Sequence, residues 1–272
     1  MPAVRWWDGQ AWTKTVAPSP VEPSLPGGGE QRRSPDLARD SSREAFPLPA
    51  FGFAVAGALV GILVLGGVGA LLASELLPRS SAAQTLGTEI GLWFGLGGTC
   101  VLASRRYATG SLVRDYGWRL RPADVGVGLL AAVGCLVAAG LVGVAFYGSR
   151  FAGSNTQIIT NQHGNTIGVA VVTLIAAVGA PIFEELFFRG LLRQALASRL
   201  GAGAIWVQAV FFGLAHFQPG AGLGNVSVVA ATAAIGVILG YVTSLTGRLG
   251  ADTIAHGLFN LTVTISIIGV IR

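Results

Sequence analysis

Two adjacent glutamates and an arginine lie inside a strongly apolar segment, where charged side chains are costly. Residues 181–190 read Pro-Ile-Phe-Glu-Glu-Leu-Phe-Phe-Arg-Gly and contain Glu184, Glu185 and Arg189. A charge within a membrane span costs about 2.5–3.5 kcal/mol on insertion scales and indicates a functional site by default. Glu185 precedes Arg189 by four residues, the favourable order for a helical ion pair. Glu184 is rotated by about 100° from Glu185, so we expect it to face a different partner; a purely structural ion pair would leave Glu184 unexplained.

A histidine follows in the next apolar segment, which reads Phe-Gly-Leu-Ala-His and ends at His216. A lone histidine in an apolar helix is more often a packing residue than a catalyst. If the two segments form an antiparallel hairpin that turns near Leu200, Glu184 lies 16 residues before the turn and His216 lies 16 after it. Equal counts predict that the carboxylate and the imidazole lie at the same depth. There they could share a water molecule, as a general base requires.

A third polar group lies in the last apolar segment, at His256 and Asn260. Residues four apart share one face of a helix. Two polar side chains on one face could donate hydrogen bonds to a developing oxyanion, or could simply bond each other and a neighbouring helix. We expect Asp252, near the start of this segment, to be a cap or interface residue. We expect His163, in a polar loop, to be exposed and uninvolved.

The composition defines the kind of fold that must position these residues. Of the 272 residues, 52% are hydrophobic and 11% are charged, against about 25% charged in an average soluble domain. The mean hydropathy is +0.64. These values exclude an ordinary cytosolic domain and predict an all-α, polytopic membrane helical bundle. Cys100 and Cys135 fall inside apolar segments, so we expect two small buried residues and no disulfide.

Apolar segments of sufficient length mark the membrane spans. About 20 apolar residues, at 1.5 Å each, cross a bilayer core of about 30 Å. Gly is dense in these segments, which suits close packing of helices in lipid. We predict about seven transmembrane helices, of which the fifth is short: 51–77, 87–104, 124–147, 166–192, 204–217, 225–246 and 249–270.

The basic residues predict an orientation for the bundle. Fourteen Lys and Arg residues lie in the N-terminal tail and in alternate loops, and two lie in the intervening loops. Cytoplasmic loops carry the excess of Lys and Arg, so we expect a cytoplasmic N-terminus and, with seven spans, a C-terminus outside. The net charge of +5 therefore does not indicate nucleic acid. With 17 Arg to one Lys and 40 Gly, we expect a multi-pass protein of a bacterial plasma membrane.

The N-terminal tail is divided by composition. Residues 1–16 contain three Trp residues in the pattern Arg-Trp-Trp-Asp-Gly-x-x-Trp-Thr. This pattern resembles a short Trp-rich module that precedes membrane domains in many bacterial proteins of unknown function, truncated here at its N-terminal side. Residues 17–50 are rich in Pro, Gly, Ser and charge, which predicts a disordered linker. The transmembrane domain is expected at 51–272.

The three motifs together carry a family resemblance. Glu-Glu-x-x-x-Arg, Phe-x-x-x-His and His-x-x-x-Asn follow in this order on three predicted spans. The set resembles the CPBP family of intramembrane proteases, which includes the CAAX prenyl endopeptidases and bacterial Abi-type members. The resemblance covers about residues 100–270. It implies cleavage of a membrane-associated substrate near its C-terminus, in a cavity that opens to the cytosol, with Glu185 and Arg189 holding the site in shape and Glu185 assisting catalysis.

The resemblance also implies a role for each remaining motif residue. By motif position, Glu184 and His216 would activate the attacking water. His256 and Asn260 would stabilise the tetrahedral oxyanion. These roles agree with the hypotheses drawn from spacing alone.

A metal ion is the open question in this mechanism. Glu184, His216 and His256 could supply three ligands of a catalytic zinc site. The chain lacks His-Glu-x-x-His, the zinc-binding helix of zinc-dependent membrane proteases. The resemblance equally supports a glutamate mechanism without metal. We favour no cofactor and keep zinc as the alternative.

Two other functional classes remain compatible with the sequence. Buried Glu, His and Arg also mark ion pathways in membrane transporters, although no internal repeat of the transporter kind is visible. A catalytically silent immunity or scaffold protein would carry the same motifs without turnover. The proposed partners are a membrane-associated peptide or protein substrate and the lipid bilayer, and no nucleic acid.

Overall fold

The computed structural model describes most of the chain beyond the N-terminal tail. The predicted Trp-rich segment 1–16 and linker 17–50 lie largely outside the described residues, and His163 lies outside them too. The described residues are 3–4, 17–18, 46–154, 156–162 and 164–271.

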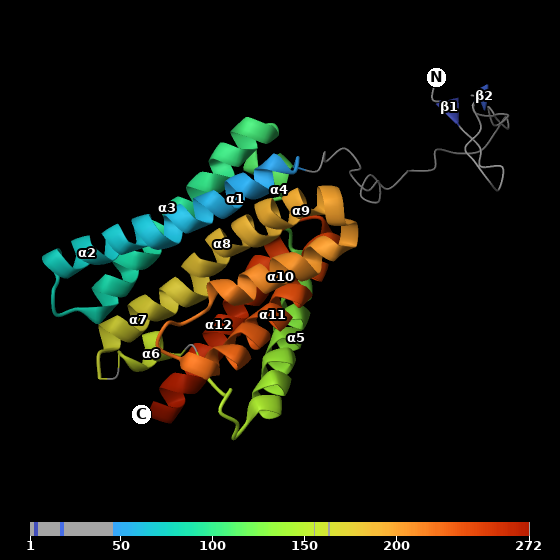
Figure 1. Cartoon of the computed structure of the whole chain (residues 1–272). Helices are drawn as coiled ribbons and strands as arrows, with labels where there is room; N and C mark the ends of the chain where they lie inside the picture. Colours follow the sequence, from blue (N-terminus) through green and yellow to red (C-terminus); the bar gives the residue numbers. More distant parts are fainter. Residues whose placement is uncertain (1–2, 5–16, 19–45, 155, 163, 272) are drawn as a thin grey trace. The chain divides into compact units, whose positions relative to one another are not determined.

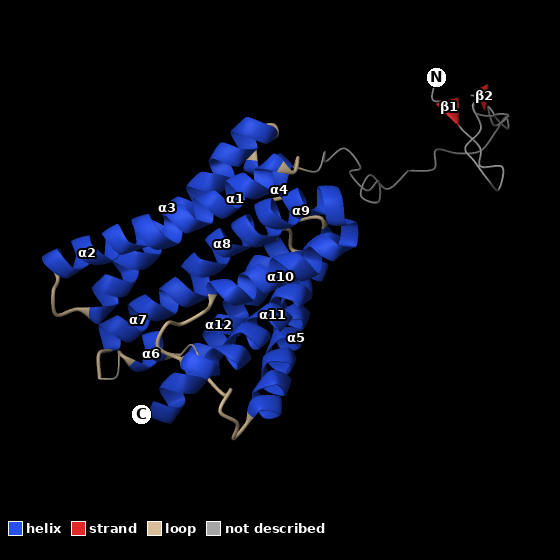
Figure 2. Ribbon diagram, in the orientation of Figure 1, coloured by secondary structure: helices blue, strands red, loops and turns tan. Residues whose placement is uncertain are grey.

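The chain divides into two units, residues 1–41 and residues 42–272. The first contains two short strands, β1 (Ala3–Val4) and β2 (Ala17–Pro18), which pair antiparallel. The second is helical with short connections wherever the structure describes it, as Figure 2 shows. The prediction of a polytopic helical membrane bundle is confirmed for this unit, because six of its described helical stretches are long and apolar enough to cross a membrane.

The first two stretches form an antiparallel pair held by glycines. One stretch is continuous through α1 (Pro49–Val60), the π-helical η1 (Gly61–Leu65) and α2 (Gly66–Leu76); the other is α3 (Ser81–Tyr107). A Cβ atom at Gly95 would lie 2.3 Å from the Cα atom of Gly61. Gly69 and Gly87 approach each other equally closely along the same pair. Only glycine permits this contact between backbones, as is usual for helices packed in lipid.

A long helical rod in the middle of the sequence carries the two glutamates. It runs without a break from Thr166 to Leu200 and contains two π-helical turns. In Figure 1 this rod lies between α1–α3 on one side and the later helices on the other. Its parts are α7 (Thr166–Leu174), η2 (Ile175–Gly179), α8 (Ala180–Glu184), η3 (Glu185–Leu192) and α9 (Arg193–Leu200).

The rod and the next helix form the expected hairpin. The chain turns at Gly201, whose positive φ of 53° suits glycine. Phe188 and Phe212, each 12 residues from Leu200, meet with ring centroids 5.1 Å apart. Because the turn is itself a short 3-10 helix, Gly201–Gly203, the predicted fourth and fifth spans form one helical stretch of 50 residues, Thr166–Ala215. The structure therefore has six helical stretches where about seven spans were predicted, because two predicted spans are counted as one.

The remaining helices complete the bundle. Their bounds are α4 (Leu112–Tyr116), α5 (Ala123–Phe146), α6 (Gln157–Thr160), α10 (Ala204–Ala215), η5 (Gly222–Gly224), α11 (Asn225–Thr246) and α12 (Gly250–Ile271). α12 contacts α5, α6, α11 and the rod near the glutamates, and α10 packs against α11.

One end of the bundle gathers the arginine-rich loops. Arg248 forms an ion pair of 2.6 Å with Asp124 at the start of α5. The backbone N–H of Leu249 donates to the carbonyl of Gly117, and Gln194 of α9 donates to the carbonyl of Asp115. These contacts bring the 108–122 loop, the end of α9 and the α11–α12 turn to the same end. We call it the arginine-rich end.

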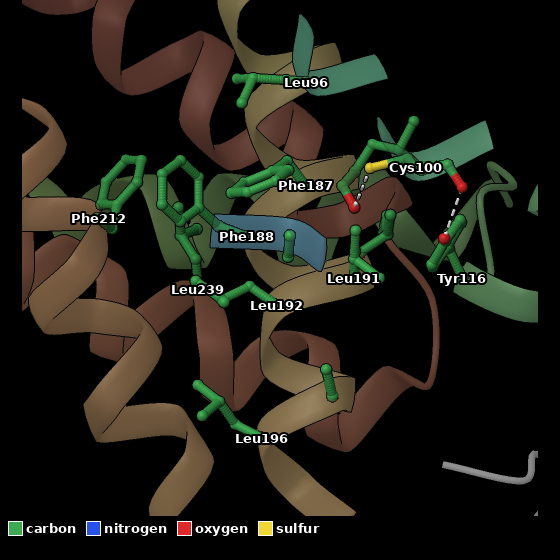
Figure 3. Packing of buried hydrophobic residues seen from close by; sticks show 14 of the residues in the cluster. Leu96, Cys100, Tyr116, Phe187, Phe188, Leu191, Leu192, Leu196, Phe212 and Leu239 are labelled. Atoms are coloured by element: carbon green, nitrogen blue, oxygen red, sulfur yellow. Dashed lines mark hydrogen bonds between the residues drawn. The ribbon is translucent and has the colours of Figure 1, made fainter. Parts of the chain in front are cut away.

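Asp115 organises the 108–122 loop at this end. Its carboxylate accepts hydrogen bonds from the hydroxyls of Ser104 and Thr109 and from the backbone N–H of Ser111. Burial opposes ionisation of Asp115, but these hydrogen bonds outweigh it and hold its pKa below the ordinary value. Burial also raises the pKa of the adjacent Tyr116, whose hydroxyl donates to the carbonyl of Cys100 (Figure 3).

The core of the bundle lies around η3. Figure 3 shows its side chains between residues of α3, α10 and α11. Cys100 and Cys135 are free and buried, as predicted. The buried cluster includes Leu96, Phe187, Phe188, Leu191, Leu192, Phe212 and Leu239.

Candidate active site

Pro181, one turn before the glutamates, removes one backbone N–H donor from the otherwise continuous rod. In the π-helical turn η2, the backbone N–H of residue i+5 donates a hydrogen bond to the carbonyl of residue i. For example, the N–H of Ala180 donates to the carbonyl of Ile175. The carbonyl of Ala176 would need the N–H of residue 181, which proline lacks. The side chain of Asn260 supplies the missing donor, with its Nδ2 atom 2.7 Å from the carbonyl oxygen of Ala176. An amide nitrogen has two N–H donors, and this hydrogen bond uses one of them.

Glu185, Arg189 and His256 form a buried network. The side chains of Glu185 and Arg189 are fully buried, with Nη1 of Arg189 3.1 Å from Oε1 of Glu185. The same oxygen lies 2.7 Å from Nδ1 of His256. The guanidinium of Arg189 also lies 4.2 Å from the centroid of the Phe212 ring, which adds a cation–π contact. Glu185 therefore joins the rod to α12 and orients the imidazole of His256.

Glu184 forms no ion pair with Arg189 among the described residues, and its near neighbour is His256. The Oε2 atom of Glu184 lies 4.0 Å from Nε2 of His256, beyond direct hydrogen-bond range. When Glu185 is a carboxylate it can only accept, so Nδ1 of His256 carries the shared proton. His256 is thus held between the two glutamates, with Nδ1 toward Glu185 and Nε2 toward Glu184.

His216 lies at the end of α10, on another wall of the site. Its Nδ1 atom is 2.8 Å from the carbonyl oxygen of Phe212, and its ring packs against the Phe212 ring. His216 and Glu184 line the same cavity, but no hydrogen bond joins them in the described part of the chain. Glu184 and His216 thus line the same cavity, as predicted from their equal depth. The imidazole nitrogen that approaches the Glu184 carboxylate, however, is Nε2 of His256.

The cavity has a volume of about 520 Å³ and lies between α1–η1, α3, the rod and α10. This is within the range of small-ligand sites. Its walls are largely apolar. Leu59, Ile62 and Leu214 line it and are each about half exposed, so the cavity reaches the lipid-facing surface. The polar side chains that line it are Thr88, Glu89, Glu184 and His216.

Glu89 is a site residue that the sequence analysis missed. The predicted span 87–104 placed Glu89 at its boundary, where a charge is unremarkable. α3 in fact begins at Ser81, so Glu89 lies two turns inside the span and lines the cavity with Glu184. The signal was available, because a carboxylate within an apolar helix calls for a partner or a function.

Asp252 lies behind the site, at a contact between two helices. Its side chain is fully buried, and the Thr243 hydroxyl of α11 donates a hydrogen bond to it. One turn later α12 carries His256. Asp252 therefore belongs to the framework that holds α12 and does not line the cavity.

The proposed zinc ligands do not form a metal-binding group in this arrangement. Among the described residues, no three His, Cys, Asp or Glu side chains lie close enough together to hold a metal ion. Nδ1 of His256 is already bonded to Glu185.

A polytopic helical bundle with a Glu–Arg–His network beside a cavity defines a membrane protein with an ionisable site among its spans. Residues 166–262 match a family described as type II CAAX prenyl endopeptidase Rce1-like. The matched segment contains all three motifs but begins at α7, later than the resemblance at 100–270. The match supports, at the level of the family, the resemblance of this segment to CAAX-type intramembrane proteases.

The N-terminal tail has a match of its own. Residues 1–24 match a family described as a protein of unknown function, DUF2510. A search of curated proteins found no match, and a search of solved structures found none either. The family match within the helical unit therefore comes from the segment that carries the three motifs.

Proposed function

We propose that the protein is an intramembrane endopeptidase that hydrolyses a peptide bond of a membrane-associated peptide or protein. One observation carries this proposal. Glu184 faces a cavity that reaches the lipid, beside an imidazole that Glu185 and Arg189 hold in place. The cavity supports entry of a substrate segment from the bilayer, and its carboxylate–imidazole pair supports activation of water.

The proposed chemistry begins with Glu184 as general base. A water molecule bonded to Glu184 attacks the carbonyl carbon of the scissile bond, and its proton passes to the carboxylate. The tetrahedral intermediate collapses as the C–N bond breaks. The leaving amine takes the proton from Glu184, which restores the carboxylate. His216, on the other wall of the cavity, helps to orient the water.

The oxyanion of the intermediate needs hydrogen-bond donors in fixed positions. The second N–H of Asn260 is one proposed donor. His256 is the other, acting through Nε2 when both ring nitrogens carry protons. Glu185 and Arg189 act as positioning residues, because Glu185 is bonded to Nδ1 of His256 and Arg189 is paired with Glu185.

We also propose that the arginine-rich end faces the cytoplasm of a bacterial cell. The described helical unit has eight Arg residues near this end and only Arg79 and Arg150 near the opposite end. Such an excess marks the cytoplasmic side. The start of α1 lies at the arginine-rich end and α12 runs away from it, which supports a cytoplasmic N-terminus and a C-terminus outside.

The test compares newly formed peptide termini in membranes of one bacterial host. The host expresses the wild type, Glu184→Gln or the control Glu75→Gln at matched levels; Glu75 is exposed near the end of α2. We expect the wild type and the control to produce a set of new peptide termini that Glu184→Gln does not produce. If Glu184→Gln gives the same termini as the wild type, the proposed function is wrong, and ion-flux assays would test the transporter alternative.

A further inference from the structure

The cavity contains more negative charge than the proposed chemistry uses. Glu89 of α3 and Glu184 of α8 both line it, and among its described lining residues there is no Lys or Arg. General-base catalysis requires one carboxylate, so Glu89 needs a separate explanation.

Elsewhere in the bundle, buried carboxylates have partners. A carboxylate in apolar surroundings is costly unless it is paired or hydrogen-bonded. The described residues include four buried carboxylates, and each has a donor: Asp115 with Ser104, Asp124 with Arg248, Glu185 with Arg189, and Asp252 with Thr243. Glu89 is only partly buried, in the cavity wall, and no described residue donates a hydrogen bond to it or forms an ion pair with it.

Glu89 and Glu184 lie on different helices that line the same cavity. Glu89 lies two turns from the start of α3, and its neighbours in the cavity wall are Thr88 and Gly66. His256, which approaches Glu184, does not line the cavity. A substrate segment in the cavity therefore meets Glu184 on the rod and Glu89 on the opposing α3.

We infer that Glu89 determines specificity by binding a Lys or Arg side chain of the substrate, close to the bond that is cleaved. This inference rests on the proposed function and names the substrate class of the same site. Lys and Arg have long apolar stems with a charged head, which matches apolar walls that end in a carboxylate. The bound cation would also offset the repulsion between Glu89 and Glu184 and leave Glu184 free to hold water.

The inference predicts a signature in the cleaved proteins. Termini that depend on Glu184 should carry Lys or Arg near the new end more often than the membrane proteome as a whole. If wild type and Glu184→Gln give the same termini, the proposed function fails and the inference with it. If Glu184-dependent termini form without enrichment of Lys or Arg, the inference alone is overturned.

Purified full-length protein and two synthetic peptides give the decisive comparison. Both peptides match a cleavage site found in membranes, one with Lys and one with norleucine, which is uncharged and of similar length. For the wild type and for Glu75→Gln we expect kcat/KM to be at least about tenfold higher with the Lys peptide, as for a desolvated charge pair. For Glu89→Gln we expect the ratio of the two values to approach one. An unchanged ratio in Glu89→Gln, or no preference in the wild type, overturns the inference.

A conservative variant separates charge from shape. Glu89→Asp keeps the carboxylate but withdraws it by one methylene, so we expect a ratio between those of the wild type and Glu89→Gln. It also replaces Glu89→Gln if that variant fails to accumulate. In that case a ratio equal to the wild-type value would count against the inference.

Discussion

Removing the cation of the buried pair is the sharpest test of the network, and Arg189→Ala does so. The variant leaves Glu185 in place, fully buried, with His256 as its remaining partner. The two charged atoms are 3.1 Å apart, so Coulomb's law with an effective dielectric constant of about 20 gives about 5 kcal/mol. Breaking a buried pair by removing one partner typically costs about 3–5 kcal/mol. The loss of the cation–π contact with Phe212 adds to this cost.

A loss of this size is a large share of the stability of a folded chain, which is about 5–15 kcal/mol. We therefore expect Arg189→Ala to lower the yield in membranes. We also expect it to lower the midpoint of thermal unfolding in detergent by on the order of 10 °C. The control is Arg199→Ala, in the same helical rod but exposed, which should change stability by no more than about 0.5 kcal/mol.

The double variant Glu185→Met, Arg189→Met removes both charges, so that no unpaired buried charge remains. Replacing both members of a buried pair by apolar residues is often neutral or stabilising. We expect it to be more stable than Arg189→Ala but inactive, because His256 loses the carboxylate that orients it. An Arg189→Ala variant with wild-type yield and unfolding midpoint would refute the argument that this pair holds the site together.

Four further outcomes follow from the structure. Glu184→Gln and His216→Ala should each lower cleavage by about 10²- to 10⁴-fold with membrane yield nearly unchanged, and wild-type turnover in either variant would contradict the assigned role. Asn260→Ala should lower both stability, by about 1–3 kcal/mol, and activity, because the carbonyl of Ala176 loses its donor; a loss of activity alone would contradict the supporting role. The pKa of Asp115 is lower in the folded chain than its ordinary value, so its stabilising contribution is present above that value and lost as the pH falls below it. Thermal unfolding between neutral pH and about pH 3 should therefore show a steeper acid loss in the wild type than in Asp115→Asn, and equal slopes would contradict it. A chelator should leave cleavage unchanged; its abolition, with recovery on adding zinc, would establish a metal.

Local periodicity explains what could be predicted. The ion pair of Glu185 and Arg189 depends only on a spacing of four residues in a helix, and the structure contains it. The hairpin depends on equal counts on either side of a glycine turn, and the contact of Phe188 with Phe212 has that register. Composition predicted the membrane bundle, because a bilayer requires long apolar helices.

Contacts between distant helices could not be predicted in this way. His256 approaches both glutamates because α12 packs against the rod where Pro181 frees a carbonyl for Asn260. Glu89 faces the cavity because of how α3 is rotated against the rod.

The sequence by itself thus determined the membrane location of the helices, the three motifs and the neighbours along each helix, since these follow from residue type and helical period. Only the tertiary structure decided which histidine approaches Glu184 and which carboxylates share the cavity. The physical reason is that spacing along one helix fixes a residue's angle and depth on that helix, whereas proximity between helices depends on their rotation and crossing. Those are set by packing over the whole bundle, including close glycine contacts such as Gly61 with Gly95.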